Sequence, residues 1–326
     1  MQALALLLTA TAEVAPIASI AAWWERHRAL AARGHAPIDL ALLGGFGADR
    51  LGYAFSSGYQ AALRALVPDL PSDRLVSLCV TERGGASPKA ITTTLTPRAE
   101  GGHRLDGAKR WTTLAAEGGL FLVAARQGED AQGRPRLRVA RVGSSASGVH
   151  VDAMPETPFV PEIPHAELRF EGVAVREEDL LPGDGYERYV RPFRTVEDVH
   201  VNAALLGYLM GEARRNGLDR ALIERLAAAV VALRGLSAGD PSAPALHVTL
   251  GGLLRTQSAL VEEIDAAWGA KVSPTHARWQ RDRVLLQVAE NARTQRLARA
   301  WERIAALQQV SLGQSAGQGS GGSAGS

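Results

Sequence analysis

The chain has 326 residues, of which 46% are hydrophobic and 21% charged, a composition typical of a globular protein with two or three structural units. Lysine and arginine number 36 against 34 for aspartate and glutamate, and no basic run is flanked by aromatic residues, so a nucleic-acid partner is not expected. Cys79 is the only cysteine, which excludes a disulfide framework and a thiolate metal cluster and favours a reducing, cytoplasmic location.

Residues 1–73 predict an N-terminal helical domain. Alanine and leucine recur there at three- and four-residue spacing, and the clearest helical pattern stops at Pro68. The apolar opening has no basic residue before Arg26 and is interrupted by Glu13 and Pro16, so we interpret it as a helix rather than a targeting signal. No run approaches the roughly 20 apolar residues that span a bilayer, so membrane insertion is not expected.

Residues 74–184 predict a central β domain. Short runs such as "RLVSLCV", "GLFLVAA", "RLRVARV" and "AELRFEGVAV" have β-type composition and are separated by turn residues. Asp106 and Gly107 lie between "HRL" and "AKRWTT". They predict a two-residue hairpin, because both positions tolerate the positive φ that a type I′ turn requires.

Residues 185–311 predict a C-terminal helical domain, in which the pattern places helices at about 195–215, 219–235, 244–268 and 275–309. Residues 312–326 are rich in glycine and serine and predict a flexible tail that buries no core. The predicted order along the chain is therefore helices, strands and helices.

The common nucleotide, hydrolase and metalloprotease motifs are absent from the sequence, and the eight histidines lack metal-ligand spacing, so no metal site is expected. The segment "TERGGAS", residues 81–87, follows a predicted strand. Its small residues would let backbone N–H groups converge on an anion such as a pyrophosphate, with the hydroxyls of Thr81 and Ser87 as further donors. A plain glycine-rich turn is the alternative for this segment alone.

A second segment, "RLDGAKRWTT", presents Trp111 among polar residues. Strand alternation puts Trp111 and Thr113 on one face, so the indole could cover a flat ring while the hydroxyl reaches a heteroatom at its edge. The alternative is a tryptophan that fills the core of the β domain.

Read together and in order, "CVTERGGAS", "GGHRLDGAKRWTT", "GLFLVAAR", "GVHVDAM" and "AELRFEGVAVREEDLLPGDGYER" resemble the acyl-CoA dehydrogenase family. The family pattern is "TEPxxGS" after a strand, then "GxKxWITN", then "FxxVxVPxxNLLG" and a helix. The resemblance implies an α+β fold with an N-terminal helical domain, a central β barrel, a C-terminal four-helix bundle and FAD between barrel and bundle. It also implies an acyl-CoA or other acyl thioester as substrate, an electron-transfer flavoprotein or similar acceptor, and a homodimer or homotetramer.

Carried over residue by residue, the resemblance implies eight cofactor-binding positions, namely Leu78, Val80, Thr81, Gly85, Ser87, Trp111, Thr112 and Thr113. The first three would line the flavin ring, and Gly85 and Ser87 would lie toward its phosphate or the substrate. Trp111 would pack on the isoalloxazine, and Thr113 would hydrogen-bond near the flavin atom that receives hydride.

The family chemistry also requires a carboxylate that removes the α-proton of the thioester, and two glutamates match the family's positions for it. Glu290 stands at the family distance after Arg281 and Asp282, and Glu197 stands at the start of the first bundle helix. Each has a structural alternative. A glutamate in the first helical turn is favoured by the helix dipole, and Glu290 has the spacing for an ion pair with Arg293.

Several residues depart from the family pattern. "TER" replaces "TEP", Asp198 replaces an arginine, Asn291 and Ala292 replace Gly-Thr, and the arginine motif that reaches a neighbouring subunit's flavin is absent. Three hypotheses therefore remain open. The chain is an FAD-dependent acyl-CoA dehydrogenase, a flavin monooxygenase of the same fold, or an inactive member that serves as a binding or partner subunit.

Overall fold

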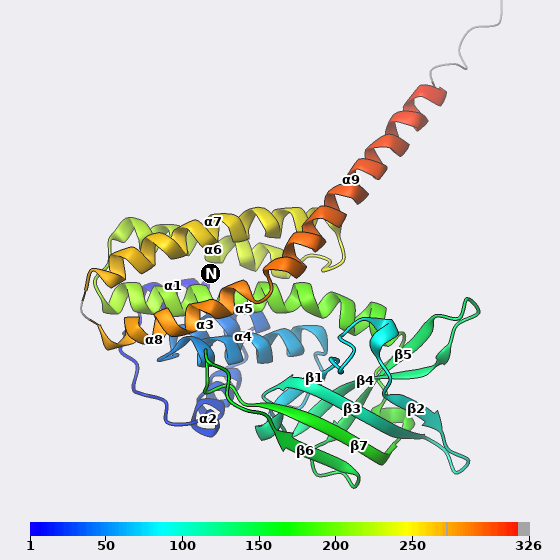
Figure 1. Ribbon diagram of the computed structural model, residues 1–326. Coiled ribbons are helices and arrows are strands. Elements are labelled where there is room, and N and C mark those ends of the chain that lie inside the picture. Colours follow the sequence, from blue (N-terminus) through cyan, green and yellow to red (C-terminus); the bar gives the residue numbers. More distant parts are fainter. Residues whose placement is uncertain (272, 319–326) are drawn as a thin grey trace, which may run out of the picture.

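A layer of helices lies against a curled β-sheet in the computed structural model, which describes residues 1–271 and 273–318, with side chains described to residue 309 (Figure 1). The chain forms four helices, then seven strands, then further helices. This order confirms the predicted α+β class.

The four N-terminal helices are α1 (Gln2–Thr9), α2 (Ile20–Ala31), α3 (Pro37–Phe46) and α4 (Leu51–Leu66). Their ends follow local chemistry. The Ser19 hydroxyl accepts a hydrogen bond from the Ala22 N–H at the start of α2, and a proline at the first position begins α3. Helix α4 ends just before Pro68, as the sequence predicts.

Seven strands form one sheet in the order β1-β4-β2-β3-β7-β6, with β5 paired to β4. The strands are β1 (Val76–Cys79), β2 (Thr94–Pro97), β3 (His103–Thr113), β4 (Leu120–Glu129), β5 (Pro135–Gly143), β6 (Val149–Ala153) and β7 (His165–Val175). Strand β2 was not among the predicted runs, because "TLTP" is short and ends in proline.

The predicted hairpin at Asp106 and Gly107 is wrong. Both residues lie inside β3, where a register shift against β7 marks a bulge, and the turn between β2 and β3 spans residues 98–102 instead. Gly107 does adopt a positive φ of 144°, and a Cβ there would lie 2.5 Å from the Thr93 hydroxyl. The glycine is therefore needed for a bulge and for close contact with Thr93. The Asp-Gly pattern alone cannot distinguish these roles from a hairpin turn.

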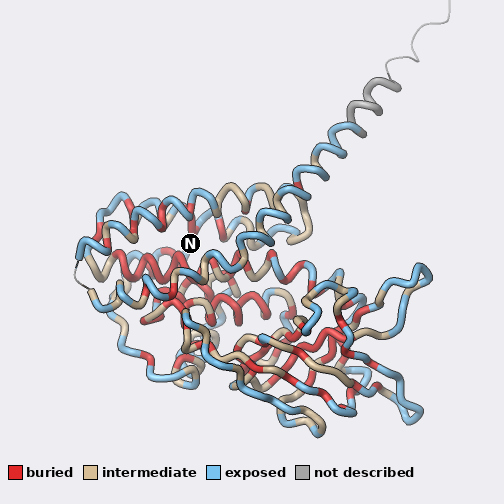
Figure 2. The backbone as a smooth tube through the Cα atoms, in the orientation of Figure 1, coloured by how far each residue is buried: buried red, intermediate tan, exposed pale blue. Residues whose placement is uncertain are grey.

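Strand β4 is buried on both faces and joins two cores. Leu122 and Ala124 point into the large cluster shared with the helices, whereas Phe121, Val123 and Ala125 point into the cluster enclosed by the curled sheet. This division follows the two-residue period of a strand. Figure 2 shows the same distribution, with burial concentrated in the sheet and in the helices next to it.

Helix α5 (Arg191–Arg215) is the central helix of the molecule and is buried over most of its length. It crosses α3 with the two backbones in contact. A Cβ on Gly45 would lie 1.9 Å from the Ala204 carbonyl oxygen, and a Cβ on Gly207 would lie 2.1 Å from that of Leu42. Because such distances are far below van der Waals contact, these glycines fix the position of α5 against the N-terminal helices.

Two long helices follow, α6 (Arg220–Ser237) and α7 (Pro244–Gly269). The single helix predicted over 275–309 is wrong, because the chain forms α8 (Pro274–Asp282), a 3₁₀ turn η5 (Arg283–Gln287) and α9 (Glu290–Gln318). The fourth position of the predicted bundle is thus divided between two helices, and the outer part of α9 extends away from the body (Figure 1).

The end of α9 also bears on the predicted tail. The helix continues into residues 312–318, and residues 319–326 lie outside the described part of the chain. None of the helices in the described part is long and apolar enough to cross a membrane.

Candidate functional site

Trp111 is presented by a bulge in β3. The register against β7 shifts between Lys109 and Thr112, and Trp111 takes a left-handed φ of 53°. This conformation is rare for a bulky residue and costs about 1–3 kcal/mol. The indole is 49% exposed and meets the His165 ring edge-on, with centroids 5.9 Å apart. The fold therefore holds a large aromatic ring in an unfavourable conformation with much of its surface uncovered.

A buried ion pair joins the loop after β1 to β3. Lys109 is fully buried, and its Nζ donates to Glu82 Oε1 at 2.7 Å. The Glu82 carboxylate also accepts hydrogen bonds from the amides and hydroxyls of Thr92 and Thr93. Burial alone would raise the pKa of Glu82, but the Lys109 charge and these hydrogen bonds outweigh it and lower the pKa to about 2. The carboxylate is thus a charged anchor for both segments.

A small pocket of about 180 Å³, here called the edge pocket, opens where these two segments meet α4 and α5. Six of the eight predicted cofactor-binding residues line it, together with Glu197 from α5 and several neighbours. These six residues are Leu78, Val80, Thr81, Trp111, Thr112 and Thr113. The Arg110 N–H donates to the Thr81 carbonyl at 2.8 Å and keeps the two strand ends adjacent. Trp111, Thr112 and Thr113 all line this pocket, because the bulge at Trp111 interrupts the strand alternation that predicted only Trp111 and Thr113 on one face.

The other two predicted positions, Gly85 and Ser87, do not line the edge pocket. Gly85 has a φ of 109° and closes a tight turn in which its N–H donates to the Glu82 carbonyl and its carbonyl accepts from the Glu82 N–H. The Gly85 N–H is therefore used within the loop, which argues against the predicted convergence of free N–H groups at this residue. Ser87 is exposed beside the turn, and its role stays a prediction.

A larger pocket of about 450 Å³, here called the deep pocket, lies between α4, α5, η5 and the loop of residues 154–164. Its walls are mainly apolar and include Leu51, Phe55, Phe159, Val160, Ile163, Leu205, Leu285, Leu286 and Val288. Trp111, Thr113 and Glu197 line both this pocket and the edge pocket. The two pockets thus meet at an indole, a hydroxyl and a carboxyl group.

Glu197 is the titratable group at this junction. Burial raises the pKa of its carboxyl to about 8, the neighbouring Asp198 charge adds to the rise, and Arg293 and Arg194 oppose it. Its side chain retains some exposure because the carboxyl faces the pockets. A carboxyl group with a pKa near physiological pH can accept or release a proton, which is the property required of a general base.

Asp198 replaces the arginine of the family pattern, and the structure shows what balances its charge. Arg293 donates to Asp198 Oδ1 at 2.8 Å and 2.9 Å, and Arg296 donates to Oδ2 at 2.6 Å. Both arginines come from α9. The predicted ion pair between Glu290 and Arg293 is therefore wrong for Arg293, whose carboxylate partner is Asp198.

Glu290 lies away from the junction of the two pockets. It is exposed at the start of α9 and lines a separate groove between α7 and α9. The family distance after Arg281 assumes a continuous helix, but the chain turns through η5 before Glu290. The structure thus places Glu197 at the pocket junction and leaves Glu290 outside it.

Several lining residues were not found from the sequence. The loop of residues 154–164 and η5 supply much of the deep pocket, although the sequence assigned no residue of either segment to the site. The spacing of Arg293 and Arg296 does carry information, because two arginines three positions apart lie on one side of a helix. Their partner, however, lies 95 or more positions away and cannot be read from local spacing.

No group of three His, Cys, Asp or Glu side chains that could hold a metal ion occurs in residues 1–271 or 273–318. Cys79 is fully buried in the sheet core, and burial raises the pKa of its thiol to about 12. The thiol is therefore protonated at neutral pH and unsuited to nucleophilic chemistry.

Comparison with known proteins finds relatives of part of the chain. Residues 77–173 match the family model described as acyl-CoA dehydrogenase, middle domain, and this segment contains β1 to β7 almost entirely. Over this sheet segment, the chain resembles the acyl-CoA dehydrogenases. A curated relative, benzylmalonyl-CoA dehydrogenase of Aromatoleum aromaticum, is 32% identical over 126 residues, which are 37% of this chain and 32% of that protein. The match thus spans about a third of the relative's length.

Solved structures extend the likeness to the whole fold. Butyryl-CoA dehydrogenase from Megasphaera elsdenii has a TM-score of 0.60 and 17% identity over 81% of each chain. The FAD complex of PigA has a TM-score of 0.64 and 13% identity over 92% of each chain. These likenesses show that the acyl-CoA dehydrogenase fold includes the helices on both sides of the matched segment.

Proposed function

We propose that this chain is an FAD-dependent oxidoreductase that removes hydrogens from the α and β carbons of an acyl thioester. The observation that carries the proposal is the position of Glu197. Its carboxyl group, with a pKa raised to about 8, lies where an aromatic edge pocket meets an apolar deep pocket. A cofactor in the first pocket and an acyl group in the second would meet at this carboxyl group.

The residues of the edge pocket suit the ring of FAD. The strained, half-exposed indole of Trp111 offers a face on which a flat heteroaromatic ring would stack, and Leu78 and Val80 offer partly buried apolar surface. The hydroxyls of Thr81 and Thr113 line the same pocket and could hydrogen-bond to polar ring atoms. The related fold of PigA, solved as an FAD complex, gives further support. Bound FAD would supply the acceptor for the hydride from the β carbon.

Glu197 would take the proton from the α carbon next to the thioester carbonyl. The carboxyl group must be ionised for this step, so the active fraction grows as the pH rises through about 8. The apolar walls of the deep pocket would hold the acyl group and exclude water from the carboxyl. Asp198, held by Arg293 and Arg296, keeps the two arginine charges paired and so limits their effect on Glu197.

The substrate and partners belong to the same proposal. We expect an acyl-CoA or another acyl thioester as substrate, an electron-transfer flavoprotein or a similar acceptor, and a homodimer or homotetramer. Native mass spectrometry of the purified protein would report the oligomeric state and any bound FAD in one measurement.

The experiment begins with the purified protein and added FAD. Binding should shift the flavin spectrum and quench its fluorescence, and anaerobic addition of a panel of acyl-CoAs should then bleach the bound flavin. Glu197→Gln should slow bleaching by about 10²- to 10⁴-fold, the range that one positioned base contributes. Glu290→Gln is the matched control and should bleach like the unmodified protein.

The remaining outcomes separate the other hypotheses. A protein that binds no FAD would exclude both flavin functions and leave the partner-subunit hypothesis. A protein that binds FAD but is bleached by no acyl-CoA would favour a monooxygenase of the same fold. Bleaching that survives Glu197→Gln and is lost in Glu290→Gln would reverse the assignment of the base.

A further inference from the structure

The loop of residues 154–164, between β6 and β7, forms one wall of the deep pocket. Thr157, Phe159, Val160 and Ile163 line the pocket from this loop. Proline occurs at every third position from Pro155 to Pro164, so the loop is stiff and offers few backbone donors. Its conformation therefore depends on the few hydrogen bonds that it makes with its surroundings.

Val160 is the strained residue of this wall. Its φ is 43°, in the left-handed region, and its side chain is 1% exposed. A β-branched residue rarely takes this conformation, and a residue that precedes a proline, as Val160 precedes Pro161, is further restricted to extended backbone. The free loop would leave this conformation, so a contact from outside must hold Val160 in place.

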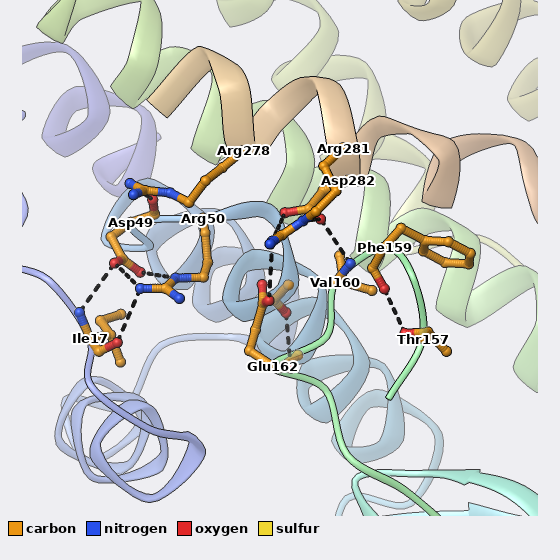
Figure 3. Close-up of polar contacts among 12 residues, drawn as sticks. Ile17, Asp49, Arg50, Thr157, Phe159, Val160, Glu162, Arg278, Arg281 and Asp282 are labelled. Carbon is orange, nitrogen blue, oxygen red and sulfur yellow. Dashed lines mark hydrogen bonds and ion pairs between the residues drawn. The ribbon is translucent and has the colours of Figure 1, made fainter. Parts of the chain in front are cut away.

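Asp282, the last residue of α8, makes that contact. Its Oδ1 accepts a hydrogen bond from the Val160 N–H at 2.8 Å, and the aspartate is fully buried (Figure 3). The guanidinium of Arg281 donates to both carboxylate oxygens, at 2.6 Å and 2.9 Å. An ionised acceptor in a buried site makes a stronger hydrogen bond than a neutral one. The chain therefore supplies an unusually strong acceptor for a single loop amide.

The neighbourhood of Asp282 contains further charges. Arg281 Nη2 lies 3.6 Å from Glu162 Oε2, and Asp49 pairs with Arg50 on the far side of the cluster (Figure 3). Both Glu162 carboxylate oxygens are buried without a hydrogen-bond partner in the described part of the chain. Within the loop, the Ile163 N–H donates to the Val160 carbonyl at 3.0 Å. Among the charged groups of this cluster in the described part of the chain, only Asp282 bonds to the Val160 N–H.

Asp282 also stands where the helix breaks. The next residues form η5, whose Leu285 and Leu286 line the deep pocket beside the loop. One aspartate thus ties two walls of the pocket together, while Glu197 lies on α5, which the glycine contacts hold separately against α3. A change at Asp282 should move the walls of the pocket without moving the base.

We infer that Asp282 is a positioning residue that sets the width of the deep pocket and thereby selects among acyl groups. The inference rests on the proposed function for the identity of the ligand. Release of Val160 would let the loop relax toward an extended backbone, which weakens the fit to a slender acyl chain and admits branched or aryl acyl groups.

The main test compares Asp282→Ala with the unmodified protein on a linear and an aryl acyl-CoA. We expect KM for the preferred acyl-CoA to rise by about tenfold or more, because the loss of one charge-assisted hydrogen bond corresponds to a change of that size. The value of kcat should change by less than about threefold. Discrimination between the two acyl groups should narrow in the same variant. Asp282→Asn keeps the side-chain volume and an acceptor oxygen, so its KM should lie between those of the unmodified protein and Asp282→Ala. This variant also serves as the test if Asp282→Ala does not fold.

A second substitution tests the mechanism directly. Glycine takes positive φ without strain. Adding Val160→Gly to Asp282→Ala should therefore lower KM by at least about threefold relative to Asp282→Ala alone. Asp49→Asn is the matched control, since Asp49 lies in the same charged cluster but bonds to Ile17 and Arg50 rather than to the loop. It should leave KM unchanged.

Two readouts do not need turnover. Amide exchange of residues 157–163 should accelerate in Asp282→Ala and not in Asp49→Asn, and calorimetry with a non-hydrolysable acyl-CoA thioether should show the same loss of affinity as KM. Unchanged exchange and unchanged affinity in folded Asp282→Ala would overturn the inference, as would equal losses in the Asp49 control. If the unmodified protein fails to bind FAD, the proposed function fails, but the exchange comparison still decides whether Asp282 holds the loop.

Discussion

The two sides of the site differ in how their residues are brought together. On the sheet side, Thr81 and Trp111 belong to the segment of the family match and are locked by the buried pair of Glu82 and Lys109. On the helix side, Glu197 and Asp198 come from α5 and Arg293 from α9, outside that match, and Arg293 reaches Asp198 from beyond the turn at η5. The sheet side thus lies within a segment shared with known proteins, while the helix side depends on contacts outside that segment.

The largest expected effect tests the sheet side. Lys109→Met removes the ammonium and leaves the Glu82 carboxylate buried and unpaired, so the free energy of unfolding should fall by about 3–5 kcal/mol. Urea denaturation followed by circular dichroism measures it. Arg110→Met is the control, because the adjacent Arg110 pairs with Glu167 at a partly exposed site and should lose less than about 1 kcal/mol. Equal losses in the two variants would mean that the buried pair does not lock the sheet side.

A smaller effect tests the helix side through pH. The folded-state pKa of Glu197, about 8, lies above its ordinary value of 4.5, so ionisation opposes folding. The stability contribution of this group is complete below pH 4.5, declines as the pH rises and is lost above about pH 8. Glu197→Gln stays neutral and should therefore gain stability over the unmodified protein across this interval.

The expected gain above pH 8 is about 1–3 kcal/mol, less than the full pKa difference implies, because the carboxyl faces an open pocket. Thermal melts of both proteins between pH 5 and pH 9 would measure it. The two proteins should coincide near pH 5. A difference in stability that is the same at every pH would show that the substitution acts through packing rather than charge. The pKa of Glu197 would then not be raised.

The smallest effect returns to the sheet side, at Trp111. Its left-handed φ of 53° is strained for alanine but not for glycine, so Trp111→Gly should be about 1 kcal/mol more stable than Trp111→Ala. Both variants should bind FAD more weakly than the unmodified protein, as fluorescence titration would report. If the alanine variant were as stable as the glycine variant, the bulge would not constrain this residue.

Much of the fold was predictable because its signals are local. The strand runs, the helical segments and the order of the three parts follow from two- and four-residue periodicities within short windows. The hairpin prediction failed because Asp-Gly reports only that positive φ is tolerated, and Gly107 uses it in a bulge that accommodates Thr93. Strand β2 escaped prediction because four residues ending in proline carry little periodic signal.

The site was predictable only where its residues are close in sequence. Trp111 and Thr113 are near neighbours in sequence and line the same pockets, although the bulge at Trp111 interrupts strand alternation there. The sequence puts Glu197 at the start of a helix, but α5 begins at Arg191, so Glu197 lies beyond the first turn and the helix dipole does not account for it. Glu290 was chosen by counting along a helix assumed to be continuous, and nothing in "RDRVLLQVAE" announces a break. At the break, Asp282 accepts from the Val160 N–H, 122 positions away, and Arg293 donates to the Leu286 carbonyl at 3.0 Å, and the first of these contacts has no local signal.

The glycine contacts between α3 and α5 divide the molecule into parts with unequal freedom to change. Any side chain larger than hydrogen at Gly45 or Gly207 would meet a neighbouring carbonyl oxygen, so α5 is confined to one position. The loop of residues 154–164 and η5 carry no such restriction over most of their length. A scan of all substitutions should therefore find few tolerated changes where α3 crosses α5 and more tolerated changes in the loop and in η5. The shape of the deep pocket can thus change while Glu197 keeps its position.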